Sequence, residues 1–123
     1  MTNTVDMPRL RVRIDLAPGS WMGPGKAELL ERIQRNGSIA AAGREMGMSY
    51  KRAWQLVEAM NGMFRDPLVE RTRGGAKGGG ATVTKAGERV LAAYRDAVEA
   101  ARRAGAGPIE ELTGMLRDVP GET

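Results

Sequence analysis

The sequence lacks both cysteine and histidine. It therefore has no disulfides, no thiol nucleophile, no Ser-His triad and none of the commonest ligands for zinc and iron. Aromatic residues make up only 4% of the chain, and no apolar run approaches the roughly 20 residues that a membrane-spanning helix needs. We expect no catalytic residue, no metal, no cofactor and no membrane contact, and by default a cytoplasmic location.

The chain has 123 residues, which is the size of one domain. Its net charge of +4 is spread unevenly, because residues 44–95 carry a basic excess and residues 105–123 an acidic excess. A basic block followed by an acidic tail favours a polyanionic partner for the block. The alternative is an ordinary solvated surface, and charge alone does not separate the two.

Apolar spacing and capping residues predict three helices in the first half of the chain. They run from Lys26 to Asn36, from Ile39 to Met46, and from Ser49 to about Met63. Gly37 suits the end of the first helix, Ser38 and Ser49 can cap the next two, and Gly47 breaks the second. The run Ala40–Gly43 has little side-chain bulk, so the third helix can cross the second closely. This favours a helix-turn-helix over a generic helical core.

Three strands are predicted from alternation and turn residues. One covers Leu10 to Leu16, and two others, Pro67 to Thr72 and Ala81 to Thr84, flank the glycine-rich segment Arg73–Gly80. The latter pair predicts a β-hairpin, or wing, with a flexible tip. A phosphate-binding P-loop is the alternative, but the segment lacks the Gly-Lys-Ser/Thr order and the preceding parallel strand.

The third helix carries the side chains that DNA recognition uses. A recognition helix enters the major groove N-terminus first, so Lys51, Arg52 and Gln55 are placed to meet base edges. Trp54 is expected to pack beside the core rather than to contact bases. The predicted DNA contacts are Ser38, Ser49, Tyr50, Lys51, Arg52, Gln55, Arg71, Arg73, Lys77 and Lys85.

A fourth helix is predicted from Lys85 to about Ala104, with Thr84 as its cap. Apolar and small residues recur along it at spacings of four and three, which is typical of a dimerisation helix. The predicted dimer contacts are Leu91, Tyr94, Val98 and Ala101. The alternative is that these side chains pack only on their own subunit. Residues 1–104 would then form the domain, and residues 105–123 a short helix or a disordered tail.

Five motifs occur here in a specific order: Ser49–Trp54, Met60-Asn61, Leu68–Arg71, Gly74–Gly80 and Thr84–Gly87. Together they resemble the N-terminal DNA-binding domain of the ModE-type molybdate-responsive regulators, which is related to the LysR-type helix-turn-helix. The resemblance covers about Leu10 to Arg103.

The resemblance implies a mainly α fold with a small β-sheet. This fold is a winged helix-turn-helix with an N-terminal strand, a β-hairpin wing and a long C-terminal dimerisation helix. It also implies a homodimer that binds a palindromic operator in double-stranded DNA, with molybdenum-related genes as targets. Regulators of this type carry further molybdate-binding domains. Residues 105–123 are too few to form one, so molybdate binding is not expected within this chain.

The leading hypothesis is therefore a sequence-specific bacterial transcription regulator. A different class, a winged helix that docks on proteins, is the alternative. The basic turn at Lys51 and Arg52 argues against that alternative. An enzyme is the third hypothesis, and the sequence offers no carboxylate pair, nucleophile-base set or metal cluster to support it.

Overall fold

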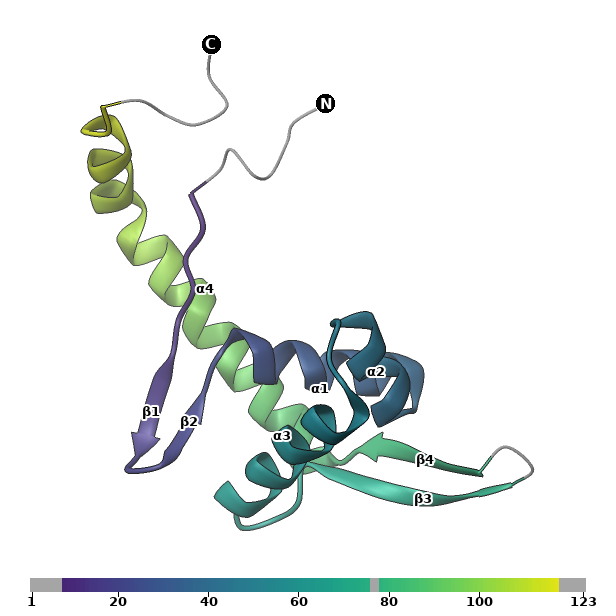
Figure 1. Cartoon of the computed structure of the whole chain (residues 1–123). Coiled ribbons are helices and arrows are strands. Elements are labelled where there is room, and N and C mark those ends of the chain that lie inside the picture. The colour runs from purple at the N-terminus through teal and green to yellow at the C-terminus, as the bar shows by residue number, and fades with distance from the viewer. Residues whose placement is uncertain (1–7, 76–77, 118–123) are drawn as a thin grey trace.

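The computed structural model describes residues 8–75 and 78–117, with the backbone alone for residues 73–75 and 78–79. This part of the chain forms four helices and two small antiparallel sheets (Figure 1). In chain order the elements are β1 (Ile14–Ala17), β2 (Ser20–Met22), α1 (Pro24–Asn36), α2 (Ile39–Glu45), α3 (Tyr50–Met63), β3 (Val69–Gly75), β4 (Gly78–Val83) and α4 (Lys85–Gly114). The predicted fold class, mainly α with a small sheet in a winged helix-turn-helix layout, is confirmed.

The helix ends follow the capping residues of the sequence. The Ser38 hydroxyl accepts a hydrogen bond from the Ala41 N–H at 3.0 Å, and Ser49 caps α3 in the same way. Thr84 does so for α4. Gly37 ends α1 with a φ of +70°, a conformation that glycine adopts without strain. All four predicted roles are confirmed.

The N-terminal sheet differs from the predicted strand. Regular pairing begins at Ile14 rather than Leu10, and β2 was not predicted. The chain turns at Gly19, which has a φ of +78°. Because α1 begins at Pro24, β2 is only three residues long, and the residues before Ile14 have no strand opposite them.

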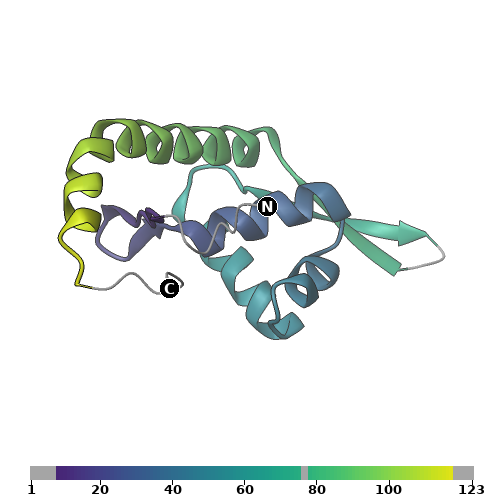
Figure 2. The ribbon, with the colours of Figure 1, turned by 90° about the horizontal axis from the view of Figure 1, so that it is seen from above.

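Helix α1 lies in the middle of the molecule, with α4 on one side and α2 and α3 on the other (Figure 2). The core gathers around it, because apolar side chains from α1, α3 and the start of the wing are removed from solvent. The largest fully buried side chains are those of Leu29, Leu30, Ile33, Val57, Met60 and Leu68.

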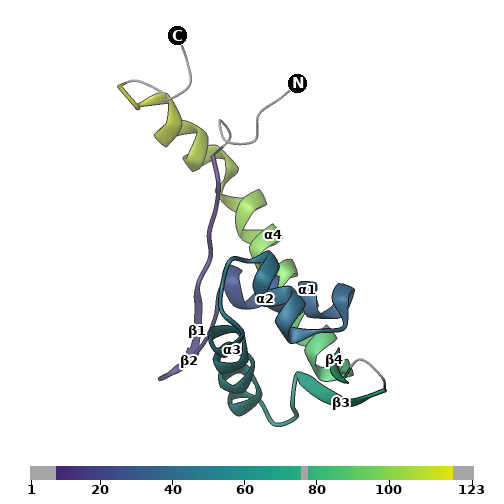
Figure 3. The ribbon, with the colours of Figure 1, turned by 45° about the vertical axis from the view of Figure 1, so that its right-hand side comes forward.

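Strands β3 and β4 pair as an antiparallel hairpin that projects away from the helices (Figures 1 and 3). We call this hairpin the wing. The strands extend into the segment predicted as a loop, with Thr72 opposite Gly80 and Gly75 opposite Gly78. Glycine weakens a strand but keeps both main-chain hydrogen-bonding groups, so pairing resumes after an irregularity between Thr72 and Gly75.

The base of the wing contacts the end of α1. The Ala81 N–H donates to the Gly37 carbonyl at 2.9 Å. A Cβ atom on Gly80 would lie 2.9 Å from that same carbonyl oxygen. Gly80 therefore permits an approach that a side chain would prevent.

Helix α4 does not end near Ala104 but continues to Gly114. Figure 2 shows that its last turns change direction. Pro108 lies within the helix, where it has no N–H to donate and its ring crowds the Ala104 carbonyl. The first part of the predicted tail is therefore a bent extension of α4.

Candidate nucleic-acid interface

Helices α2 and α3 meet at a contact that only small residues allow. A Cβ atom on Gly43 would lie 2.9 Å from the Cβ of Ala53, which is fully buried. Between the helices, Gly47 adopts a φ of +73° and the Met48 N–H donates to the Gly43 carbonyl at 2.9 Å. The predicted helix-turn-helix is confirmed, with Gly43 as its point of closest approach.

An arginine on α1 braces the outer end of α2. The Arg32 guanidinium donates to Glu45 at 2.7 Å and to Glu28 at 2.8 Å. Its hydrogen bond, followed by that of Asn36, holds the pKa of the Glu45 carboxyl below its ordinary value. Arg32 and Glu28 are partly exposed and Glu45 is exposed, so these ion pairs add little stability, and their main effect is to hold α2 against α1.

Helix α3 has one buried and one exposed face. Ala53, Val57 and Met60 face the core. The side chains of Lys51, Arg52 and Gln55 are exposed on the other face. Cationic and amide side chains at the start of an exposed helix can bond base edges and phosphates. Tyr50, 48% exposed at the first position of α3, adds a hydroxyl.

The other predicted DNA contacts occupy different places. Ser38 is half-buried, and like the exposed Ser49 it already accepts a capping hydrogen bond. Arg71 is exposed on β3, and Lys85 is exposed at the start of α4. Lys77 lies outside the described residues, as does the side chain of Arg73.

A group of cations beside α3 was missed from the sequence. Lys26 is 5% exposed, and its Nζ donates to the Trp21 carbonyl at 3.0 Å. The Lys26 Nζ and the Arg13 guanidinium lie 3.6 and 4.1 Å from the centroid of the Trp21 ring. Burial, followed by the charges of Arg13 and Arg52, lowers the pKa of Lys26. In the sequence, Lys26 stands three and four residues before Leu29 and Leu30, and this spacing could have indicated that Lys26 lies on the buried face of α1.

Asn61, near the end of α3, fastens that helix to the wing. Its Oδ1 accepts the N–H groups of Leu68 and Val69 at 2.8 and 3.1 Å, and its Nδ2 donates to the Val69 carbonyl. From the other side, the Thr84 N–H donates to the Leu68 carbonyl, and its hydroxyl donates to that of Pro67. The base of the wing is therefore fixed relative to α3, and only the family resemblance had pointed to the asparagine.

Three of the four predicted dimer contacts lie against their own subunit. Tyr94 is 5% exposed, and its hydroxyl donates to the Val12 carbonyl at 2.6 Å. Leu91 and Val98 are partly buried against the same core, whereas Ala101 is exposed. For Tyr94, Leu91 and Val98 the structure thus matches the alternative interpretation, in which the repeat serves the core.

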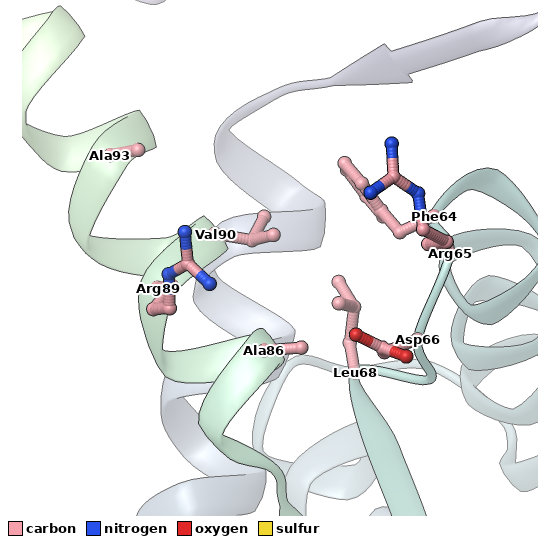
Figure 4. Close-up of a pocket in the computed structure, with 8 residues that line it drawn as sticks. All are labelled: Phe64, Arg65, Asp66, Leu68, Ala86, Arg89, Val90 and Ala93. Carbon is pink, nitrogen blue, oxygen red and sulfur yellow. The ribbon is translucent and has the colours of Figure 1, made fainter.

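A second repeat lies beside the first on α4, displaced by one residue. We call it the alanine stripe, and it consists of Ala86, Val90, Ala93, Ala97, Ala100 and Ala104. Its last four members are exposed. A groove of about 430 Å³ lies between its first part and the segment from Phe64 to Leu68 (Figure 4). A further groove of about 300 Å³ separates it from β1. An unfilled face of small residues is thus open along α4.

The arrangement of α2, α3 and the hairpin defines the winged helix-turn-helix class. Residues 25–88, more than half of the chain, match the family described as "Bacterial regulatory helix-turn-helix protein, lysR family". The chain belongs to this family. No helix in the described part of the chain combines the length and the apolar character needed to cross a membrane.

Relatives with molybdenum-related names are similar to this chain. It is 51% identical over 82 residues to "Molybdenum-pterin-binding protein MopB" of Rhodobacter capsulatus, a match that covers 67% of this chain and 30% of the relative. It is 40% identical over 85 residues to "Molybdenum transport protein ModE" of Azotobacter vinelandii, covering 69% and 32%. With "DNA-binding transcriptional dual regulator ModE" of Escherichia coli K12 the identity is 41% over 71 residues, covering 58% and 27%.

The matches thus span about a third or less of these relatives. They confirm the resemblance to the ModE-type helix-turn-helix domain that the order of motifs predicted.

Proposed function

We propose that the protein is a transcription regulator that binds double-stranded DNA sequence-specifically, as a homodimer on a palindromic operator. Helix α3 enters the major groove, with Lys51, Arg52 and Gln55 toward the base edges, and the wing follows the backbone. The observation that carries this proposal is the exposed basic and amide face of α3 beside a projecting hairpin, in a chain of a regulatory helix-turn-helix family.

The alanine stripe supports the homodimer. Small side chains at spacings of four and three let two helices approach closely over several turns. Helix α4 lies across α1 from α3 (Figure 2), so a contact through α4 leaves both recognition helices free for DNA. The symmetric pair would place its two α3 helices in successive major grooves, about 34 Å apart.

The names of the relatives support molybdenum-related genes as the targets. We do not assign molybdate binding to this chain. The role that we propose for this chain is to bind DNA.

The test is selection from a pool of genomic fragments by the purified chain at rising salt, followed by sequencing of the retained DNA. An enriched inverted repeat supports a specific dimeric regulator, and the neighbouring genes test the molybdenum assignment. With about 6–10 phosphate contacts, the affinity should fall by roughly 10³–10⁵ between about 50 and 200 mM salt. Absence of any binding would overturn the proposal in favour of a protein-docking winged helix.

A further inference from the structure

Recognition helix and wing are joined by an aromatic contact as well as by Asn61. The guanidinium carbon of Arg71, on β3, lies 4.8 Å from the centroid of the Trp54 ring, on α3. An arginine within about 6 Å of a tryptophan ring is in the range of cation–π attraction, and tryptophan is the aromatic residue that attracts cations most strongly. The contact joins the two elements of the proposed DNA interface.

Trp54 lies at the border between the buried and exposed faces of α3. It is half-buried and adjoins the buried Ala53, yet it shares a side of the helix with the exposed Lys51, three residues earlier. A side chain stacked on Trp54 is therefore held beside the basic start of the recognition helix.

Arg71 keeps its positive charge unneutralised at this place. It is exposed, and among the described residues it makes no ion pair with a carboxylate. Its neighbour Glu70 points to the opposite face of the strand, because successive side chains alternate. Glu58, one turn beyond Trp54 on α3, also forms no ion pair with it.

We infer that Trp54 is a positioning residue, which holds Arg71 ready for a phosphate at the edge of the groove that α3 enters. The inference rests on the proposed DNA binding. A guanidinium that lies over an aromatic ring and forms no ion pair with a carboxylate has N–H donors left over, and these match the geometry of a phosphate. In this proposal the contact with Trp54 restricts the Arg71 side chain before DNA arrives, so less rotamer entropy is lost when the phosphate binds. Trp54 thereby couples the position of Arg71 on the wing to the position of α3.

The experiment measures the affinity of the full chain for its selected DNA, or for a 30-base-pair duplex if no motif is enriched, over a range of salt concentrations. The proteins compared are wild type, Arg71→Ala, Trp54→Leu and the double variant. Arg71→Ala should reduce the slope of log affinity against log salt by about one. Arg95→Ala, which removes the same charge from α4, should leave the slope unchanged.

The decisive result is the coupling between the two residues. Trp54→Leu should weaken binding about two- to fivefold in the wild-type background. In the Arg71→Ala background it should have no further effect. Equal weakening in both backgrounds would mean that Trp54 only packs, and an unchanged slope in Arg71→Ala would mean that Arg71 meets no phosphate. Either result overturns the inference.

Thermal unfolding of each variant separates binding from folding. If Trp54→Leu is unstable, Trp54→Phe keeps an aromatic ring and much of the packing while it weakens the cation–π attraction, so the same cycle is run with it. Arg71→Lys keeps the charge without the planar stack and should bind between wild type and Arg71→Ala. Absence of wild-type binding to either DNA would instead refute the proposed function.

Discussion

Gln55 lies on the exposed face of α3, one turn after Lys51. An amide side chain there can bond an adenine edge in two places. We expect Gln55→Ala to lower the discrimination against one base of the operator by about 1–3 kcal/mol, with other positions unaffected. Binding to single-base operator variants measures this. Gln34→Ala, an exposed glutamine on α1, is the control, and equal weakening on every sequence would show that Gln55 does not select bases.

Asn61 makes three hydrogen bonds with main-chain groups of Leu68 and Val69. Asn61→Ala leaves these groups without their partner, so we expect the free energy of unfolding to fall by about 1–3 kcal/mol. Asn61→Asp keeps the acceptor for the two N–H groups and should cost less. Urea unfolding compares the three proteins, and the same loss in both variants would rule out this role for the acceptor oxygen.

Tyr94 should make the folded protein less stable at alkaline pH. Burial raises its pKa above the ordinary value, against smaller opposite effects of Arg95 and Arg11. Folding therefore favours the protonated phenol. This contribution is complete below the unfolded-state pKa of about 10 and is lost as the pH rises through the folded-state pKa. Melting temperatures measured from pH 8 to about 11 should fall less steeply in Tyr94→Phe. Parallel curves would contradict the assignment to Tyr94.

Residue roles that depend on near neighbours in the sequence were predictable. Ser38, Ser49 and Thr84 cap helices because each meets an N–H three residues on, a spacing visible in the sequence. The exposed face of α3 follows from helical periodicity. Asn61 bonds residues seven and eight positions further along the chain, and Trp54 contacts Arg71, 17 positions further along. Local sequence patterns do not reach that far, so neither contact between α3 and the wing could be predicted from them.

At the scale of elements, Gly43 sets the distance between α2 and α3. Alanine is favoured over glycine within a helix by about 1 kcal/mol. At position 43, however, its methyl group would lie 2.9 Å from the Cβ of the buried Ala53. Overpacking of about 1–3 kcal/mol should exceed that gain. We expect Gly43→Ala to lower both stability and DNA affinity, as thermal unfolding and binding assays would show.

Gly62 is the matched control for this substitution. It lies in α3, and a Cβ atom built on it meets nothing within 4 Å. Gly62→Ala should therefore raise stability by up to about 1 kcal/mol. If the two variants behaved alike, the contact between α2 and α3 would not depend on the absence of a side chain at position 43.

The helices were predicted to within a few residues except where glycine and proline interrupt the pattern. The fourth helix was predicted to end near Ala104, yet α4 continues through Gly105, Gly107 and Pro108 with a bend. The strands of the wing were predicted too short, because glycine was expected to end them. Strand pairing uses main-chain groups that glycine also has, so β3 and β4 extend into the glycine-rich segment. In β2, three residues were too few to show alternation.

For the whole molecule, the order of elements in the sequence predicted the fold class, but it did not predict that Leu91, Tyr94 and Val98 on α4 pack against the core of their own chain. Two repeats lie side by side on this helix, one through Leu91 and Tyr94 and the other through Val90 and Ala93. Periodicity alone does not say which of the two repeats faces the core. Leu91, Tyr94 and Val98 of the bulkier repeat pack on the core, because burying larger side chains removes more apolar surface from water.

A charge on the alanine stripe should separate the proposed dimer. Ala97→Arg places a cation on the exposed part of the stripe, where two such residues would be desolvated together. We expect a monomer with unchanged folding and weaker operator binding, as sedimentation and thermal unfolding would show. Ala92→Arg, at a position that is also exposed but lies outside the stripe, is the control. A dimer that tolerates Ala97→Arg would place the contact elsewhere.

The two tryptophans of the chain each lie against cationic side chains, Trp54 against Arg71 and Trp21 against Arg13 and Lys26. Indole fluorescence responds to nearby charge and to water. Because there are only two such rings, Trp21→Phe leaves a single emitter at the joint between α3 and the wing. The fluorescence of Trp54 would then report on the contact between α3 and the wing in solution, without an attached dye.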